Sequence, residues 1–173
     1  MKKSNIEPMP AFFDRYINLV EDIDIAEAFS KYSPEKIYEA TDKLTALGDQ
    51  AYAPAKWTVK DILQHVIDNE RIMSYRALRF SRNDNTVLPG YEEELLAANT
   101  MANERTVADL MEEFSFVRKS TELLFKNMDN EMILRSGIAY KSEISALALG
   151  FVIIGHAIHH MNIIQERYFP LLK

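Results

Sequence analysis

Three of the chain's four histidines lie close together, in the segment Gly155-His156-Ala157-Ile158-His159-His160. Successive residues of a helix turn by about 100°, so His156 and His160 fall in one apolar sector of the expected helix, whereas His159 falls at its edge. Cβ atoms four residues apart on a helix are about 5 to 6 Å from each other. That separation allows two imidazole nitrogens to bind one ion at about 2.0 to 2.1 Å. The spacing therefore predicts that His156 and His160 hold a divalent metal ion.

A third ligand has to come from another helix, and His65 is the remaining histidine. It lies between Ile62 and Val66 in a segment with helical apolar periodicity, somewhat off the centre of the apolar stripe. The alternative is that all of these are ordinary core or surface histidines. However, a polar group buried without a partner costs about 1 to 3 kcal/mol, and a shared metal ion removes that cost for two inward imidazoles.

A metal-centred reaction also needs a group that handles protons, and Glu70 is the candidate catalytic residue. It falls on the apolar stripe of the helix that carries His65, where an exposed carboxylate is not expected. Asp68 and Asn69 lie one turn beyond His65, where they either face solvent or orient a ligand imidazole. For Glu70 the favoured alternative is a buried salt bridge. The arginines considered as its partner are Arg71, Arg76, Arg79 and Arg167.

A run of arginines on the same helix suggests a second feature. Arg76, Arg79 and Arg82 could shape an anion-binding mouth with two nearby aromatic residues, Tyr75 and Phe80. The alternative is an ordinary set of solvated arginines on a helix surface.

The elements that position these residues are expected to be helices. Glycines and prolines are few, 5 and 6, and they fall mostly where helices should start or stop. Ser33, Thr58 and Thr106 are N-cap candidates, and Asp24 with Glu27 opens a shorter turn. No hairpin dipeptide stands between alternating apolar residues, so no sheet is expected. The segments expected to be helical are about 10–22, 33–48, 58–82, 92–98, 106–128 and 142–169.

Two segments resemble the DinB-like superfamily of metal-binding four-helix-bundle proteins, which includes YfiT-type hydrolases and certain thiol-dependent transferases. One segment is Tyr52-Ala53-Pro54-Ala55-Lys56-Trp57-Thr58-Val59-Lys60-Asp61-Ile62-Leu63-Gln64-His65, in which a tryptophan precedes the helix cap. The other is His156-Ala157-Ile158-His159-His160, similar to the family's closing His-x-x-x-His motif. The resemblance extends from about Ser33 to Tyr168. It implies an all-α fold, a DinB-like four-helix bundle with an additional short N-terminal helix.

The resemblance also implies that His65, His156 and His160 are metal ligands and that His159 is not. Three imidazoles leave coordination positions open, which is typical of catalytic metal sites. We therefore expect a metal-dependent hydrolase or thiol-dependent transferase that acts on a small molecule. Zinc, nickel, iron and manganese all remain candidates, since ligand type does not select among them. The alternative is a non-catalytic binding or dimerisation module with a structural metal.

The composition places limits on the remaining classes. A chain of 173 residues, 47% hydrophobic and 27% charged, suits one domain, with residues 1–32 as an N-terminal extension and 33–173 as the bundle. A net charge of -6 argues against nucleic acid as a partner. No uninterrupted run of 18 apolar residues and no signal-peptide pattern occur, which argues against a membrane span. The absence of cysteine makes a cytoplasmic location the default expectation.

The apolar residues of the N-terminal segment suggest an assembly. They are Phe12, Phe13, Tyr16, Ile17 and Val20. Such a face predicts a two-fold homodimer, and burial against the chain's own bundle is the alternative.

Overall fold

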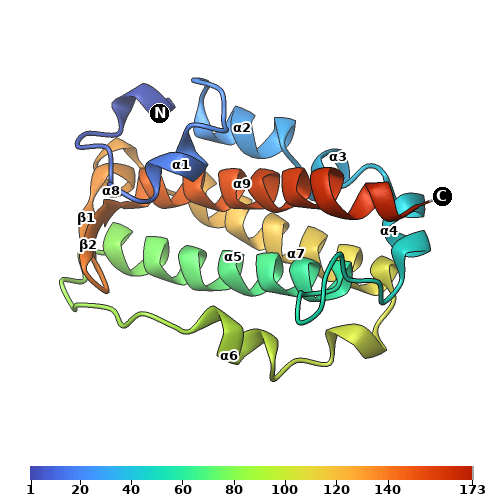
Figure 1. The fold of residues 1–173 in the computed structure, drawn as a ribbon. Coiled ribbons are helices and arrows are strands. Elements are labelled where there is room, and N and C mark those ends of the chain that lie inside the picture. The colour runs from blue at the N-terminus through green and yellow to red at the C-terminus, as the bar shows by residue number, and fades with distance from the viewer. Residues whose placement is uncertain (173) are drawn as a thin grey trace.

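The computed structural model describes residues 1–172 as a helical bundle with one short hairpin (Figure 1). Its long helices are α5 (Val59–Ser81), α7 (Val107–Lys126) and α9 (Ala146–Ile163). α5 packs against both α7 and α9. Three short helices, α2 (Ile25–Lys31), α3 (Pro34–Ile37) and α4 (Thr41–Leu47), lie along α7, and two of them also contact α9. The predicted helical bundle is confirmed.

Local capping explains where the long helices begin. The Thr58 hydroxyl accepts a hydrogen bond from the Asp61 amide at 3.1 Å, and the Asp61 carboxylate accepts from the Thr58 amide at 2.9 Å. Thr106 and Asp109 form the same reciprocal pair at the start of α7. Asp24 accepts from the Ala26 amide and starts α2. These three caps satisfy backbone donors that have no partner inside the helix, as the sequence predicted. Ser33 stands at the predicted N-cap position of α3, but its side chain makes no cap hydrogen bond there.

Two predicted helices are shorter than expected. The segment 33–48 is broken between α3 and α4, because the backbone leaves the helical region at Tyr38 (φ -107°, ψ 38°). The Tyr38 ring is fully buried, and its hydroxyl donates to the Ala157 carbonyl at 3.0 Å. Packing of this side chain therefore overrides continuation of the helix. In segment 10–22 only α1 (Asp14–Ile17) is α-helical, since Phe12 has a left-handed φ of 73°.

The expectation of no sheet is wrong for one segment. β1 (Ser136–Ala139) and β2 (Ser142–Ser145) pair antiparallel, so α9 begins at Ala146, with Ser145 as its cap, rather than near Ser142. The turn uses Tyr140 in a left-handed conformation (φ 58°) instead of a glycine or asparagine. A Cβ atom on Gly137 would lie 2.2 Å from the Phe80 ring. The hairpin is thus determined by close packing on α5 rather than by a local turn signal.

The other short elements surround this frame. η1 (Lys3–Asn5) precedes α1, and α6 (Glu93–Ala97) covers α5 where a short helix was predicted. η2 (Ala102–Glu104) leads into α7, and α8 (Asn130–Leu134) precedes the hairpin. After α9 the chain continues through a π-helical turn and a 3-10 turn. These are η3 (Ile164–Tyr168) and η4 (Phe169–Leu171).

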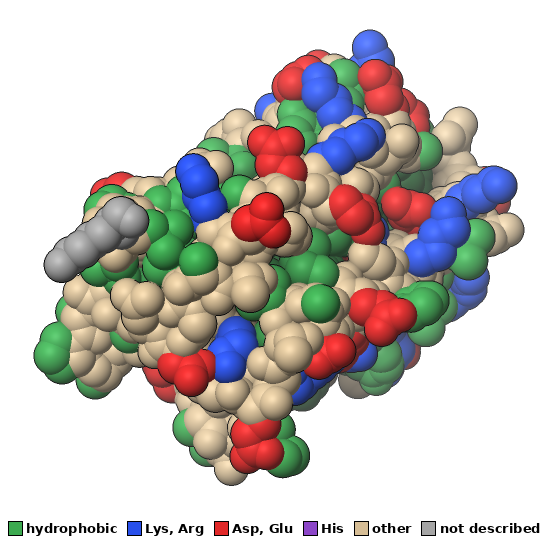
Figure 2. Space-filling model, turned by 90° about the vertical axis from the view of Figure 1, so that its right-hand side faces the viewer, with side chains coloured by type: hydrophobic (Ala, Val, Ile, Leu, Met, Phe, Trp, Pro, Cys, Tyr) green, Lys and Arg blue, Asp and Glu red, His purple; other side chains and the backbone are tan. Residues whose placement is uncertain are grey.

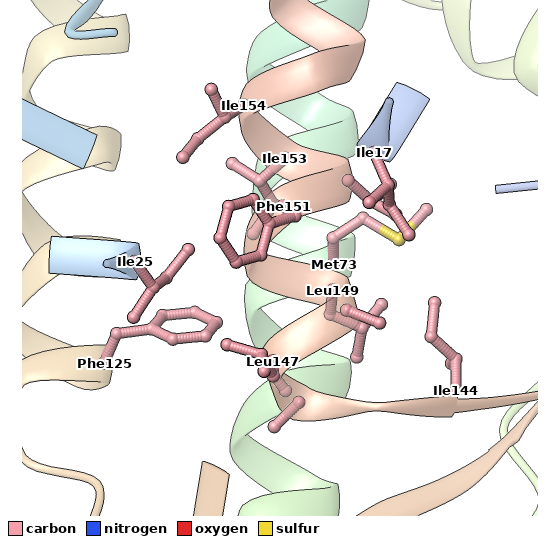
Figure 3. Close-up of a cluster of buried hydrophobic side chains, with 14 of the residues drawn as sticks. Ile17, Ile25, Met73, Phe125, Ile144, Leu147, Leu149, Phe151, Ile153 and Ile154 are labelled. Atoms are coloured by element: carbon pink, nitrogen blue, oxygen red, sulfur yellow. The ribbon is translucent and has the colours of Figure 1, made fainter. Parts of the chain in front are cut away.

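α9 is the central element of the core. Figure 3 shows its side chains Leu147, Leu149, Phe151, Ile153 and Ile154 among residues from several neighbouring elements. By length and apolar composition the segment 146–171 could cross a membrane, although it contains no uninterrupted run of 18 apolar residues. The segment is mostly buried inside the protein, as the core helix of a soluble bundle is.

The N-terminal segment packs on α9 through α1. Ile17 and Val20 are buried in the chain's own core, which removes them from any dimer surface, whereas Phe12 is exposed. The homodimer stays a prediction. On the face drawn in Figure 2, acidic and basic side chains are interspersed instead of forming a continuous basic patch.

Candidate metal centre

The structure brings together three histidines from two helices. His65 comes from α5, and His156 and His160 come from α9. The Nε2 atom of His156 lies 3.2 Å from that of His65 and 3.2 Å from that of His160. The ligand atoms of all three lie within 4.8 Å of one another. These are the residues that the sequence singled out, and their role as ligands stays a prediction.

This geometry fits a divalent metal ion. Two nitrogens that are each 2.0 to 2.1 Å from a tetrahedral ion are separated by about 3.3 Å, close to both measured distances. The nitrogens cannot satisfy one another, because a neutral His156 Nε2 has either one hydrogen or one lone pair for two neighbours. A metal ion at the centre of the group would accept one Nε2 lone pair from each histidine, and no nitrogen would then need a hydrogen bond from another.

The imidazoles have the charge state that metal binding requires. Burial, and to a smaller extent the charge of His159, lower the pKa of His65 to about 4. Burial, followed by the neighbouring histidines, lowers the pKa of His160 to about 2 and that of His156 well below its usual value. All three rings are therefore neutral near pH 7, and neutral imidazole is the form that coordinates metals.

One wall of the site depends on a glycine. A Cβ atom on Gly155 would lie 2.0 Å from the Tyr16 carbonyl oxygen, so only a glycine permits α1 to lie this close to α9. This approach places the Tyr16 ring edge-on against His156, with 5.2 Å between the ring centroids, and against His159 at 5.3 Å. α1 consequently fixes one side of the histidine group. His159 itself lies outside that group, as the resemblance implied.

Trp57, the tryptophan that precedes the cap of α5, forms a second wall of the site. Its ring lies 4.9 Å from that of His65. Its carbonyl accepts a hydrogen bond from the Tyr168 hydroxyl at 2.6 Å, and its indole N–H donates to Glu94 at 3.1 Å. The tryptophan thus joins the end of the C-terminal helical segment and α6 to the first histidine.

Two cavities adjoin the histidines. The larger, of about 380 Å³, reaches His156, and the smaller, of about 200 Å³, reaches His160. Glu93 of α6 lines both cavities. The volume of the larger cavity is within the range of small-molecule sites. Side chains on its lining that carry polar groups are Arg15, Tyr16, Asn69, Arg76, Tyr91, Glu92, Glu93 and Tyr140.

Glu70 forms the predicted buried salt bridge, but none of the four proposed arginines is the partner. Its carboxylate accepts from Arg118 of α7, at 3.0 Å from Nε and 2.9 Å from Nη2. Both side chains are only 2% exposed. Arg118 was missed although it lies four residues after Phe114, on the inward face of α7, where a charged residue calls for a partner. No observation tests the catalytic role predicted for Glu70.

Asp68 and Asn69, the two residues before Glu70, have different surroundings. Asp68 pairs with Arg71 at 3.5 Å and does not line either of these cavities, whereas Asn69 is buried and lines the larger one. Burial raises the pKa of Asp68, and its hydrogen bond from Gln64 acts in the opposite direction.

The predicted arginine mouth is largely wrong. Arg79 pairs with Asp84, Arg82 is exposed and does not line the cavity, and only Arg76 of this run does. Tyr75 is exposed outside the cavity and Phe80 is buried in the core. Helix rotation explains the difference, since residues three apart drift around the helix.

Comparison with known proteins supports the same fold. The sequence profile of the DinB superfamily matches residues 14–164. YfiT from Bacillus subtilis, described as a probable metal-dependent hydrolase with an unusual four-helix bundle topology, matches with a TM-score of 0.65 and 16% identity. The match covers 87% of this chain and 91% of that chain, and at this identity it establishes the fold. No curated protein matches the sequence.

Proposed function

Because this chain belongs to the DinB superfamily, we propose that it is a metal-dependent enzyme acting on a small molecule, with His65, His156 and His160 as ligands of one divalent ion. A hydrolase and a thiol-dependent transferase are the two reaction classes under consideration. The description of YfiT as a metal-dependent hydrolase supports the first. The cytoplasmic location and the homodimer belong to the same proposal as expectations.

The observation that carries the proposal is the position of the three-histidine group beside a cavity of about 380 Å³. A divalent ion bound there would polarise a substrate oxygen or lower the pKa of a bound water. The chain's own residues would bind and orient the substrate next to it. Tyr91 is suited to hold a proton, because burial raises the pKa of its hydroxyl and keeps it neutral. Asn69 donates to that hydroxyl oxygen at 2.6 Å and orients it.

A structural metal in a non-catalytic module fits the geometry less well. Structural zinc sites are almost always closed by four protein ligands. Within residues 1–172 the group contains three histidines and no carboxylate, and the chain has no cysteine to complete it. The adjoining cavities give a small molecule access to this side of the site.

Metal analysis of the full-length protein tests the proposal. We expect about one zinc, nickel, iron or manganese ion per chain by elemental analysis, or its uptake after chelation, with loss in His65→Ala. Cobalt(II)-loaded protein should change its visible absorption when azide is added, because an open position accepts the anion. Absence of bound metal together with no uptake would refute a metal enzyme. A cobalt spectrum that ignores azide, with unfolding on metal removal, would instead support the structural module.

A further inference from the structure

We propose that the larger cavity binds a small monocarboxylate with an apolar or aromatic body, and that Arg76 is the residue that recognises the carboxylate. This assignment deepens the proposed function, because it names the class of substrate for the same site. It rests on Arg76, on the neutral polar groups beside it and on the aromatic mouth of the cavity.

Arg76 is a buried arginine to which the described residues offer no acidic partner. Its side chain belongs to a residue only 5% exposed that lines the cavity. Among residues 1–172 no carboxylate lies within ion-pair distance of it, whereas Arg118, the other buried arginine, is paired with Glu70. A buried charge is costly unless it is paired, so the guanidinium needs an anion that the described protein does not supply.

The guanidinium is held in place with donors to spare. Its Nη2 donates to the Pro89 carbonyl at 2.9 Å, and its Nη1 makes a weak contact of 3.6 Å with the Met73 sulfur. The Pro89 carbonyl is itself positioned, because the adjacent Leu88 exchanges backbone hydrogen bonds with the hairpin at Ile138 and Tyr140. Within residues 1–172 the remaining N–H groups have no partner, so they can bind the paired oxygens of a carboxylate, for which the planar guanidinium is suited.

Two neutral polar groups accompany Arg76 in the cavity. Tyr91 lies under the guanidinium, with 5.7 Å from Cζ to the ring centroid. Because the Tyr91 oxygen accepts from Asn69, its own hydrogen remains available to an anion. The buried Asn69 Oδ1 has no hydrogen-bond partner among the described residues, so a hydrogen-bond donor on the body of the ligand would satisfy it.

The mouth of the cavity indicates the rest of the ligand. Phe12 and Tyr140 both line it, and they are 59% and 61% exposed. Both have left-handed backbone conformations, with φ of 73° and 58°. Such strain in residues other than glycine persists only where surrounding structure enforces it, and it is concentrated at ligand sites. Exposed aromatic rings at the entrance suit an apolar body.

The charged side chains around the cavity favour a ligand with a single negative charge. Arg15 and Arg76 line the cavity together with Glu92 and Glu93, and both glutamates are exposed. One buried cation therefore faces the ligand, and the exposed carboxylates disfavour a dianion such as phosphate.

Calorimetric titration of the full-length protein with benzoate tests this assignment, with benzamide as the neutral analogue and inorganic phosphate as the dianion. Arg76→Met should weaken benzoate binding about 10-fold to 100-fold. Arg76→Lys should fall between Arg76→Met and wild type, because it keeps the charge and loses the planar fork. Arg82→Met is the matched control and should bind as wild type, because Arg82 is an exposed arginine at the C-cap of the same helix. Circular dichroism of each variant checks folding, and Arg76→Lys maintains the test if Arg76→Met does not fold.

The same titrations in His160→Ala separate this inference from the metal proposal. Benzoate binding that depends on Arg76 and survives in His160→Ala supports the carboxylate site, even if the wild-type protein were to bind no metal. Binding lost in His160→Ala but kept in Arg76→Met would place benzoate on the ion and overturn the inference, while the metal proposal would stand. No wild-type affinity for benzoate, or equal affinity for benzamide or phosphate, would also overturn it.

Discussion

Replacing Glu70 by glutamine should destabilise the fold without weakening the metal site. Glu70 accepts from Arg118 through both carboxylate oxygens, and Arg118 also donates to the Tyr32 carbonyl at 2.7 Å. Its guanidinium lies 5.5 Å from the Phe29 ring and 5.4 Å from the Phe114 ring. Glutamine preserves the volume of the side chain but leaves a guanidinium buried without a counter-charge.

The expected cost follows from this geometry. Breaking a buried ion pair by removing one partner costs about 3 to 5 kcal/mol. For a chain of this size that corresponds to a fall in Tm of roughly 6 to 20 °C. Arg118→Met should cost a similar amount. The double variant Glu70→Leu with Arg118→Met should recover most of the loss, because it leaves no unpaired charge.

Urea unfolding followed by circular dichroism gives the free energies of unfolding, and metal titration of the same samples gives the affinity. We expect the affinity of Glu70→Gln to remain within about twofold of wild type, since the carboxylate is engaged by Arg118 and not by the histidine group. A Glu70→Gln variant that retains its stability and loses metal or activity would contradict a purely structural role for the ion pair. That outcome would instead support the catalytic role that the sequence predicted for Glu70.

Three further predictions concern the histidines and their surroundings. His160→Ala should sharply lower metal affinity, whereas His159→Ala should leave the stoichiometry unchanged by elemental analysis; equal losses would contradict the observed geometry. Gly155→Ala should destabilise the protein by about 1 to 3 kcal/mol in urea unfolding, because the new Cβ meets the Tyr16 carbonyl oxygen. An unchanged urea midpoint would show that α1 can move away from α9 without a cost in stability. In the metal-free protein, the lowered pKa of His65, about 4 against about 6.5 when unfolded, makes the unfolded state bind the proton first. The stability that neutral His65 contributes should therefore be fully present above pH 6.5 and be lost as the pH falls toward 4. Thermal melts measure this pH dependence, and a His65→Gln variant that shows the same dependence as wild type would rule out the contribution.

Much of the helical frame could be predicted from the sequence because its signals are local. The caps at Thr58 and Thr106 involve residues three positions apart, so their hydrogen bonds need no contact with a distant part of the chain. The helical repeat likewise places His156 and His160 on one face before any packing is considered. Charge on an apolar stripe also predicted that Glu70 would be buried and paired.

Other features depended on residues that are distant in the chain. The hairpin at 136–145 has no turn glycine, and its position comes from the contact of Gly137 with α5. The break at Tyr38 reflects a hydrogen bond to α9 more than a hundred positions away along the chain. Such contacts are decided by the sum of packing free energies, which no local pattern contains.

The sequence by itself determined that two imidazoles share an inward face and that a third from another helix was available to join them. Only the tertiary structure decided that His65 reaches His156 at 3.2 Å, that Arg118 neutralises Glu70, and that Arg76 lines the cavity without an acidic partner among residues 1–172. The physical reason is that a helix's own geometry sets the direction of its side chains, whereas the partner each side chain meets depends on how separate helices pack.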